Sequence, residues 1–398
     1  MPALLQAIRQ RYPETVFVVA TADRQKRTVT ADGVTYATLA TPRNATFGGS
    51  VPGYLESEIQ GLIAGFGPDL VHIHGTEDFY SRLSPRALCG RPTLVSLQGV
   101  INGYAPHYAG NIASCELDRF RTLRNYVFRD GVSDVQWLWS NAKSAQERKS
   151  LACHQNYAGR TDWDRAWLRA FNPGATYHHL DEVMRDPFYT VIRDPVLATR
   201  NSIYCSAAAT YPLKGLHFLL QAIAILKPRF PDIQLRVANA RRVLETPRGI
   251  VARLKDRDFP AFLRDLIGRL GLWGHVTALP MLSAEEVAAE LRRAHLFCLP
   301  SLCENSPNSL AEAMLVGTPA VATLVGGVPS FVRHMQDALL CPSGDAAVLA
   351  FTMGQLLEDS ALAEKLAASA REVALARHDT RRVAEETMKV YHATLVNR

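Results

Sequence analysis

The stretch HLFCLPSLCENSPNSLAEAMLVGTPAVAT (residues 295–323) is the clearest indicator of the fold. Its two ends, HLFCLPS (295–301) and TPAVAT (318–323), are short apolar runs typical of strands buried on both faces of a sheet. Between them, Ser306 is predicted to be the N-cap of a helix and Pro307 its first residue, because proline has no N–H to leave unsatisfied there. A strand, a helix and a second strand in this order predict a parallel α/β unit.

The same alternation extends along the chain in both directions. Further strands are predicted at TVFVVAT (15–21), DLVHIHG (69–75), PTLVSLQG (92–99), SIYCSAA (202–208), IQLRVAN (233–239) and HVTALP (275–280). Helices are predicted over 2–11, 54–65, 112–150, 215–227, 260–270 and 285–294, the last opened by a Ser283–Glu286 capping box, with two or three more over 345–398. We therefore predict an α/β protein with two Rossmann-like, doubly wound parallel-sheet domains that face each other across a cleft. Ligands of such sheets bind beyond the carboxyl ends of the strands.

Composition and charge exclude several classes of protein. Lys and Arg number 44 and Asp and Glu 38, and a net charge of +6 over 398 residues does not predict a nucleic-acid partner. No apolar run reaches the roughly 20 residues that cross a bilayer, and there is no signal-peptide pattern. The seven cysteines never form a CxxC pair, which favours reduced thiols. We expect a cytoplasmic protein, free or at the inner face of the membrane.

The decisive motif lies in the segment quoted first. Glu304 and Glu312 are separated by seven residues, and the turns Gly317-Thr318-Pro319 and Gly326-Gly327-Val328-Pro329 follow. This segment resembles the E-x7-E signature of retaining glycosyltransferases of family 4, which have the GT-B fold. The resemblance implies that Glu304 faces the donor sugar and Glu312 the ribose. It also implies a donor site lined by Asn305, Ser306, Pro307, Asn308, Ser309, Gly326 and Gly327. Independently of the family, amides at the start of a helix suit a phosphate.

A second element is Tyr211-Pro212-Leu213-Lys214-Gly215, which resembles the Lys-Gly element of the same family. The resemblance implies that Lys214 pairs with the donor diphosphate and shares catalysis with Glu304. An arginine usually precedes that lysine by about six residues in the family, whereas this chain has alanines at 207–209. The clamp then rests on Lys214 and backbone amides, or on Arg241 or Arg242 after the strand that ends at Asn239, which is also expected at the donor site.

The N-terminal half gives weaker signals. Asp69-Leu70-Val71-His72-Ile73-His74-Gly75 resembles a family strand, which places His74 at the cleft and leaves His72 as a structural histidine. Gln98-Gly99 stands where the family often has His-Gly. Arg160, in Gly159-Arg160-Thr161-Asp162-Trp163-Asp164, holds a phosphate or an acidic sugar, or caps a helix. Asp162-Trp163-Asp164 and Asp256-Arg257-Asp258 spell DxD, but the first is better explained as a helix cap and the second as a charged loop. We expect no metal and no cofactor beyond the nucleotide sugar, which is a co-substrate.

The resemblance also divides the chain. It implies an acceptor-side domain over 1–190, a nucleotide-sugar domain over 191–375 and a C-terminal helix over 376–398 that returns to the first domain. GT-B N-terminal domains ordinarily begin with a strand, whereas this chain begins with a helix, so the first strand is expected to be missing. The strand at 15–21 is then left with an exposed edge or a homodimer contact.

The implied function is a retaining hexosyltransferase in polysaccharide or glycolipid assembly. It moves a sugar from a nucleotide-diphosphate sugar, UDP-sugars being favoured, to a hydroxyl of a glycan or lipid-linked acceptor. The alternatives are a nucleotide-sugar epimerase or hydrolase of GT-B fold, and a catalytically silent scaffold. Arg119, Arg121, Arg124 and Arg129 lie among aromatic residues, and they form either a peripheral membrane contact or a solvated helix face.

Overall fold

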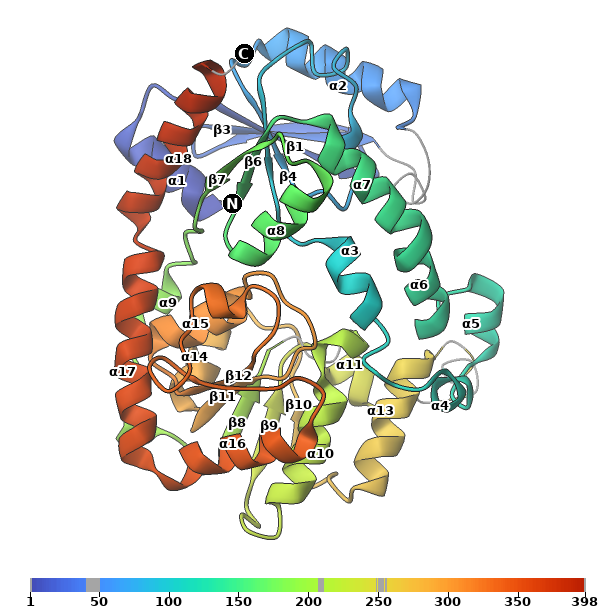
Figure 1. Ribbon diagram of the computed structural model, residues 1–398, viewed down its shortest axis with the longest axis vertical. Coiled ribbons are helices and arrows are strands. Elements are labelled where there is room, and N and C mark those ends of the chain that lie inside the picture. Colours follow the sequence, from blue (N-terminus) through green and yellow to red (C-terminus); the bar gives the residue numbers. More distant parts are fainter. Residues whose placement is uncertain are drawn as a thin grey trace. The chain divides into compact units, whose positions relative to one another are not determined.

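The computed structural model describes residues 2–40, 51–206, 211–247, 249, 254 and 256–396. The chain forms two compact units. Unit 1 comprises residues 1–102, 141–183 and 378–398, and unit 2 comprises residues 103–140 and 184–377. Each unit contains a parallel sheet with helices packed on it, so the predicted α/β class holds for both (Figure 1).

The sheet of unit 2 has six parallel strands in the order β10-β9-β8-β11-β12-β13. Their bounds are β8 Ser202–Cys205, β9 Gln234–Val237, β10 Val276–Ala278, β11 Leu296–Leu299, β12 Ala320–Thr323 and β13 Leu339–Cys341. The chain winds outward from β8 in both directions, so the strand order reverses between β8 and β11. That reversal is the position where doubly wound sheets bind ligands, at the carboxyl ends of the strands.

Both faces of this sheet are buried, which explains the uninterrupted apolar runs of its sequence. Ile203 and Cys205 of β8 pack into one core cluster, whereas the intervening Tyr204 packs into the other. The first cluster is covered by α10 (Leu216–Leu226), α13 (Asp258–Arg269) and α16 (Ala346–Glu358), and the second by α14 (Ala284–Arg293), α15 (Asn308–Val316) and α17 (Ser360–Arg377). All five strands predicted for this half are present, and the capping box of α14 is confirmed. Only β13 was not predicted.

Unit 1 contains a four-stranded parallel sheet in the order β4-β5-β6-β7. The strands are β4 Val71–His74, β5 Thr93–Ser96, β6 Asn156–Gly159 and β7 Thr176–His179, and α7 (Ser144–Cys153), α8 (Asp162–Phe171) and α18 (Thr380–Val396) belong to the same unit. β4 and β5 lie where DLVHIHG and PTLVSLQG predicted them. β6 and β7 were not predicted, because the polar residues of TYHH (176–179) and the short run NYAG (156–159) do not stand out as strands.

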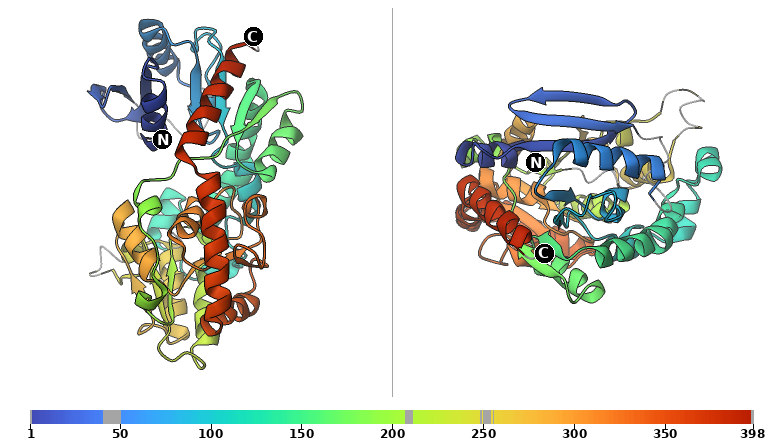
Figure 2. Two further views of the ribbon diagram at one scale, coloured as in Figure 1. Left: turned by 90° about the vertical axis from the view of Figure 1, so that its left-hand side faces the viewer. Right: turned by 90° about the horizontal axis from the view of Figure 1, so that it is seen from above.

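A separate three-stranded sheet of unit 1 has the order β1-β3-β2. β1 (Phe17–Asp23) pairs parallel with β3 (Val34–Ala40), and β2 (Arg27–Ala31) pairs antiparallel with β3 through a turn at Asp32-Gly33. Leu39 of β3 packs with Leu55 and Ile59 of α2 (Gly53–Phe66), and α2 lies beside this sheet in Figure 2. β1 therefore lies at a sheet edge, as expected for 15–21. The opening helix α1 (Pro2–Arg11) packs on α18.

Residues 103–140 correct the predicted domain over 1–190, because they group with unit 2. The helical stretch expected over 112–150 is divided into α4 (Ser114–Asp118), α5 (Leu123–Phe128), α6 (Val132–Leu138), a π-helical turn and α7, and the short α3 (Ile101–Tyr104) precedes it. Three contacts hold this segment in unit 2. The Asp258 carboxylate accepts from the Val132 amide (2.7 Å), the His217 ring bonds the Gly110 carbonyl (2.8 Å), and Phe120 packs edge-on against Phe262.

The two other boundaries lie within a few residues of those expected. The chain passes from unit 1 to unit 2 between residues 183 and 184, and residues 378–398 group with unit 1. The segment 165–190, for which no helix or strand was predicted, contains the end of α8, all of β7 and α9 (Pro187–Thr190). In the described part of the chain, no helix combines the length and the apolarity needed to cross a membrane.

Candidate functional site

In unit 2, the loop between β11 and α15 presents the first predicted carboxylate. Glu304 is buried (6% exposed), and its Oε1 accepts a hydrogen bond from the Lys214 ammonium (2.7 Å) and one from the Ser301 hydroxyl (2.7 Å). Both of these bonds use Oε1, and among the described residues no hydrogen bond reaches Oε2. Oε2 of Glu304 is therefore the oxygen that can accept from a ligand hydroxyl.

Lys214 is held at this carboxylate by the tight turn that contains it. It ends the 3-10 turn η5 (Pro212–Lys214), and Gly215 follows with φ +74°, in the left-handed region. A Cβ at Gly215 would overlap the carbonyl oxygen of Pro300, at the end of β11. Only glycine allows the backbones to come this close, so the Lys-Gly pair fixes the lysine against the loop of Glu304.

The glycine pair after β12 approaches the same loop. Gly326 has φ +49°, and a Cβ there would overlap the backbone carbonyl oxygen of Glu304. The amide of Gly327 donates a hydrogen bond to that same oxygen (3.0 Å). Gly326 and Gly327, predicted as donor-site residues, thus lie against the backbone of the predicted catalytic carboxylate.

The start of α15 differs by one position from the prediction. The helix begins at Asn308, so Pro307 occupies the N-cap and Ser306 precedes it, and no side chain caps the helix. Pro307 has ψ 110°, an extended backbone conformation of the kind that an N-cap residue adopts before the first helical turn. The Ser306 hydroxyl instead accepts from the Arg377 guanidinium (3.3 Å). The amides of Asn308 and Ser309 lie in the first turn, where a helix has no internal acceptors for them and can bind an anion.

The second predicted carboxylate, Glu312, lies further along α15 and is also buried (7% exposed). Its Oε1 accepts from the guanidinium of Arg185 (2.8 Å). Burial raises the pKa of Glu312, and the hydrogen bond and charge of Arg185 oppose that rise. Sequence reasoning missed Arg185, because it lies in a segment for which no helix or strand was predicted and no motif marks it.

The predicted residues after β9 are placed differently. Asn239 has φ +51° and its amide donates to the Pro280 carbonyl (3.0 Å), so it shapes the turn after the strand. Arg241 opens α11 (Arg241–Leu244), and its exposed guanidinium pairs with Glu245 (3.5 Å). Among the described residues, no ion pair joins Arg241 to Glu304 or Glu312. The alanines at 207–209, where the family arginine is missing, lie outside the described residues, and the replacement of that arginine by Arg241 stays a prediction.

Unit 1 brings its four predicted residues to one edge of its parallel sheet. His74 ends β4, Gln98 and Gly99 follow β5, and Arg160 follows β6. The Arg160 guanidinium is buried (6% exposed) and donates to the Gln98 side-chain oxygen (3.0 Å). It also pairs with the carboxylate of Glu182, beyond β7. The carboxyl ends of all four strands therefore contribute to one polar cluster, as expected for the ligand-binding edge of such a sheet.

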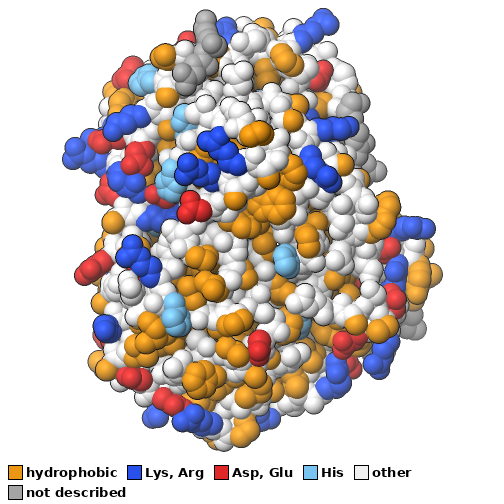
Figure 3. All heavy atoms as spheres, viewed as in Figure 1, with side chains coloured by type: hydrophobic (Ala, Val, Ile, Leu, Met, Phe, Trp, Pro, Cys, Tyr) orange, Lys and Arg blue, Asp and Glu red, His pale blue; other side chains and the backbone are white. Residues whose placement is uncertain are grey.

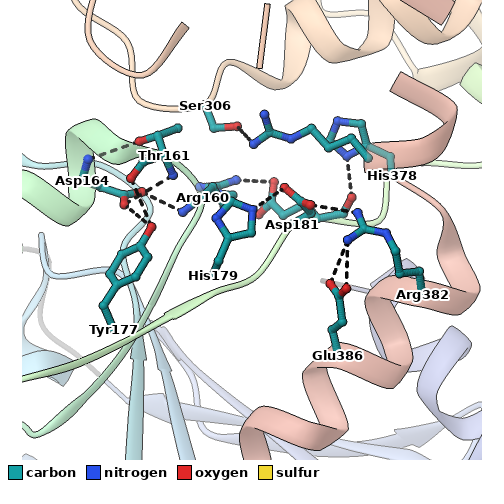
Figure 4. Close-up of polar contacts among 12 residues, drawn as sticks. Arg160, Thr161, Asp164, Tyr177, His179, Asp181, Ser306, His378, Arg382 and Glu386 are labelled. Atoms are coloured by element: carbon teal, nitrogen blue, oxygen red, sulfur yellow. Dashed lines mark hydrogen bonds and ion pairs between the residues drawn. The ribbon is translucent and has the colours of Figure 1, made fainter. Parts of the chain in front are cut away.

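Figure 4 shows the acidic side of this cluster. Asp181 pairs with Arg382 of α18 (2.9 Å), and the His378 ring bonds the Glu182 carbonyl (2.7 Å). Sequence reasoning missed Asp181 and Glu182. Both follow β7, which was itself not predicted, so nothing in the sequence assigned them to a strand end.

The first DxD is a helix cap, as predicted. Thr161 is the N-cap of α8 and forms a capping box with Asp164. The Asp164 carboxylate also accepts from the Arg160 amide (2.9 Å) and from the Tyr177 hydroxyl (2.7 Å) (Figure 4). In the second DxD, Asp258 opens α13 and accepts from the Val132 amide. These bonds give Asp164 and Asp258 structural roles.

The loops of unit 1 beside Gln98 are held by two buried acids that were not predicted. Glu147 accepts from the amides of Ile101 and Asn102 (2.8 Å each) and from the Thr76 hydroxyl (3.0 Å). Glu77 accepts a backbone hydrogen bond from Gly99, and burial raises the pKa of both carboxyls. The amide of Gly99 is therefore already engaged, and its loop is fixed from within unit 1.

Comparisons with known proteins give a family match over part of the chain. Residues 190–373 match the family described as glycosyl transferases group 1. An MMP alpha-(1->4)-mannosyltransferase of Mycolicibacterium hassiacum is 32% identical over 197 residues, which are 49% of this chain and 44% of the relative. A D-inositol 3-phosphate glycosyltransferase of Corynebacterium urealyticum is 32% identical over 46% of this chain and 40% of its own. The chain thus matches less than half the length of these curated relatives.

Solved structures match nearly the whole chain. A sucrose-phosphate synthase from Thermosynechococcus elongatus has a TM-score of 0.71 at 17% identity, covering 96% of this chain and 89% of its own. The Anabaena protein HepE in complex with UDP and glucose has a TM-score of 0.67 at 16% identity, covering 98% and 95%. The fold is therefore GT-B, as the resemblance implied. Together with the match over 190–373, these similarities support a glycosyltransferase.

Proposed function

We propose that this protein is a retaining glycosyltransferase of family 4, which moves a sugar from a nucleotide-diphosphate sugar to a hydroxyl acceptor. The observation that carries the proposal is the Lys214–Glu304 pair at the carboxyl edge of the unit 2 sheet, beside the start of α15 and the turn at Gly326-Gly327. A cation, amides at a helix start and a buried carboxylate are the groups needed to bind a diphosphate and an adjoining sugar.

Each group has a distinct role in this proposal. Lys214 and the amides of Asn308 and Ser309 bind the donor diphosphate. Glu304 accepts a hydroxyl of the donor sugar through Oε2, and Glu312 accepts the ribose hydroxyls. Glu312 lies about one turn inside α15, so a nucleotide whose phosphates sit at the helix start extends its ribose along the helix toward that carboxylate.

The proposed reaction takes place on one face of the sugar. The bond between the anomeric carbon and the phosphate oxygen breaks, and its electron pair stays on the phosphate. The acceptor hydroxyl oxygen forms the new bond to the anomeric carbon, and its proton passes to the departing phosphate oxygen. Lys214 and the α15 amides stabilise the negative charge that grows on the phosphate. The Glu304 carboxylate stabilises the positive charge that develops on the sugar ring. Configuration is retained because the acceptor enters from the side that the phosphate leaves.

The acceptor side is assigned to the cluster of unit 1. Arg160, Gln98 and His74 offer a cation, an amide and an imidazole at one sheet edge, a set suited to hydroxyls or to an anionic group on a glycan or lipid-linked acceptor. UDP-sugars are the first donors to test. One structural neighbour, the Anabaena protein HepE, was solved with UDP-glucose.

The test is a panel of UDP-, GDP- and ADP-sugars, incubated with the protein with and without simple glycosides as acceptors. We expect release of nucleoside diphosphate with one donor class and a product of retained anomeric configuration by NMR. Glu304→Ala and Lys214→Ala should each lower turnover by about 10²–10³-fold, which is typical for removing a preorganised charged contact.

The matched control is Glu358→Ala. It removes an exposed glutamate at the end of α16 that pairs with Arg229, and it should leave turnover unchanged. Near-normal transfer by the Glu304 or Lys214 variant would overturn the assignment of the site. A changed sugar without acceptor consumption would instead indicate an epimerase, and no turnover with any donor would indicate a silent scaffold.

A further inference from the structure

Unit 2 carries a cluster of exposed apolar side chains on α5 that the catalytic proposal does not use. We define the α5 patch as Leu123, Tyr126, Val127 and Phe128 of α5 with Trp137 of α6, all of them 62–70% exposed. Four of the six residues of α5 thus present large apolar side chains to the surface. Exposed apolar groups this concentrated mark interaction sites in proteins.

Two arginines hold the aromatic rings of the patch in place. Arg121 pairs with Asp134 (2.7 Å) and lies over the ring of Tyr126 at 4.6 Å. Arg124 pairs with Asp130 (2.8 Å) and lies 5.6 Å from the centre of the Phe128 ring. The rings are therefore oriented by the fold, so their exposure is built into this segment.

Two other arginines flank the patch with free charge. Arg119 and Arg129 are exposed, and within the described residues no ion pair engages either guanidinium. Residues 119–129 contain four arginines and no acidic residue. In Figure 3, orange and blue side chains meet at the right-hand edge, at the position that Figure 1 labels α5.

This arrangement bears on the two interpretations left open for these arginines. A solvated helix face would expose the arginines and bury the apolar residues of the same helix. Here the apolar residues are the exposed ones, and two of the arginines are engaged beside them.

We propose that the α5 patch docks the protein on an anionic bilayer surface. Leu123, Val127 and Phe128 would enter the boundary of the acyl chains, while Tyr126 and Trp137, which have a polar tip on an apolar ring, suit the headgroup level. Arg119 and Arg129 would meet lipid phosphates. Binding of this kind rises with the apolar area buried and with attraction to anionic lipid.

Charge complementarity favours a bilayer over a protein partner. A protein would need a surface shaped for the side chains of the α5 patch and acids placed opposite both Arg119 and Arg129. An anionic bilayer offers an apolar phase and phosphates at the same time, with no fixed shape. This proposal does not depend on the donor site, because it involves neither α15 nor the Lys214 turn.

The test is co-sedimentation of the full chain with phosphatidylcholine vesicles, with and without phosphatidylglycerol, at low and at physiological salt. We expect binding to the anionic vesicles that weakens with salt. Val127→Asp and Phe128→Asp should each weaken it about tenfold or more, as expected from keeping one large apolar side chain out of an apolar phase. The paired change Arg119→Ala with Arg129→Ala should remove the preference for anionic lipid.

The matched control is Val196→Asp, the same substitution at another exposed valine of unit 2 (90% exposed, in η4, Pro195–Leu197), which should bind like the unmodified protein. Equal loss in Val127→Asp and Val196→Asp would overturn the proposal, as would failure of the unmodified protein to bind at low salt. Sedimentation velocity provides the remaining arm. Self-association that Val127→Asp abolishes, without vesicle binding, would make the patch a contact between copies and would also overturn it.

Discussion

The Lys214–Glu304 pair allows a prediction in which stability and activity respond differently. Substituting Lys214 by Met removes the cation and leaves the Glu304 carboxylate with the Ser301 hydroxyl as its hydrogen-bond donor among the described residues. Glu304→Gln removes the charge instead and keeps an oxygen that can accept from Ser301. Both variants should lose turnover, but only the first leaves a charge buried without its partner.

The magnitude follows from the geometry of the pair. Lys214 Nζ lies 2.7 Å from Glu304 Oε1. Two unit charges about 4 Å apart at an effective dielectric constant of about 20 attract each other by about 4 kcal/mol before desolvation is subtracted. Breaking a fully buried pair from one side costs about 3–5 kcal/mol. The side chain of Glu304 is 8% exposed and that of Lys214 is 31% exposed, so water screens the lysine end. We therefore expect Lys214→Met to lower the free energy of unfolding by about 2 kcal/mol, and Glu304→Gln to lower it by less than about 1 kcal/mol.

The double variant provides the test. In Lys214→Met with Glu304→Gln no charge is left without its partner, so it should unfold at a higher urea concentration than Lys214→Met alone, with a coupling energy of about 1–2 kcal/mol. The assay is urea unfolding followed by circular dichroism, with nucleoside diphosphate release measured on the same preparations. If Lys214→Met and the double variant unfold at the same urea concentration, Glu304 does not depend on Lys214 for its charge and the reasoning is refuted.

Two further predictions concern other parts of unit 2. Gly326→Ala should displace the backbone at Glu304, because the added Cβ would overlap the Glu304 carbonyl oxygen and Gly326 has a left-handed φ of +49°. We expect this variant to lose about 1–3 kcal/mol of stability in thermal unfolding and to lose turnover. The control Gly274→Ala, with open space around its Cβ, should change neither. Burial lowers the pKa of His217 from 6.5 to about 4, so the unfolded chain binds a proton that the folded chain does not as pH falls through this window. The free energy of unfolding should then drop by up to about 1.4 kcal/mol per pH unit for this histidine; His217→Gln should reduce that slope in acid urea titrations, and an unchanged slope would contradict the burial of a neutral ring.

The strands of unit 2 could be predicted because they are buried on both faces. Runs such as LFCL in β11 carry that burial as uninterrupted apolar sequence, and two core clusters take its alternate residues. β7 could not be predicted in the same way. Its sequence, TYHH, is that of a partly exposed strand with two exposed positions, and strand propensity alone predicts it only weakly.

The assignment of residues 103–140 to unit 2 had no local signal either. It depends on contacts between residues more than a hundred positions apart, such as Val132 with Asp258 and Gly110 with His217. Hydrophobic periodicity identifies helices in this segment but not the core on which they pack. The α5 patch was equally hidden, because a sequence shows which residues are apolar and not which of them the fold leaves exposed.

The candidate site divides along the same line. The spacing of Glu304 and Glu312 identified both carboxylates, since one lies before α15 and the other within it. The cations that hold them come from elsewhere: Lys214 from the turn after β8, and Arg185 from the segment before α9. Lys214 was recognised because a glycine follows it in a family element. Arg185 belongs to no sequence pattern, and only the folded structure places it at Glu312.

These two ion pairs have a consequence for donor binding. Each buried carboxylate of the site is already paired with a cation, so the four side chains together carry no net charge. A nucleotide diphosphate that binds Lys214 competes with Glu304 for the ammonium, and any loss of that bond leaves the buried carboxylate short of a donor unless sugar hydroxyls replace the lysine. At Glu312, ribose hydroxyls would donate to the carboxylate beside or in place of Arg185. In the proposed reaction the sugar hydroxyls compensate Glu304 for a weakened bond to Lys214, and the ribose hydroxyls donate to Glu312. The site is therefore expected to favour the intact nucleotide sugar over the free nucleotide, because only the former brings hydroxyls to both carboxylates at once.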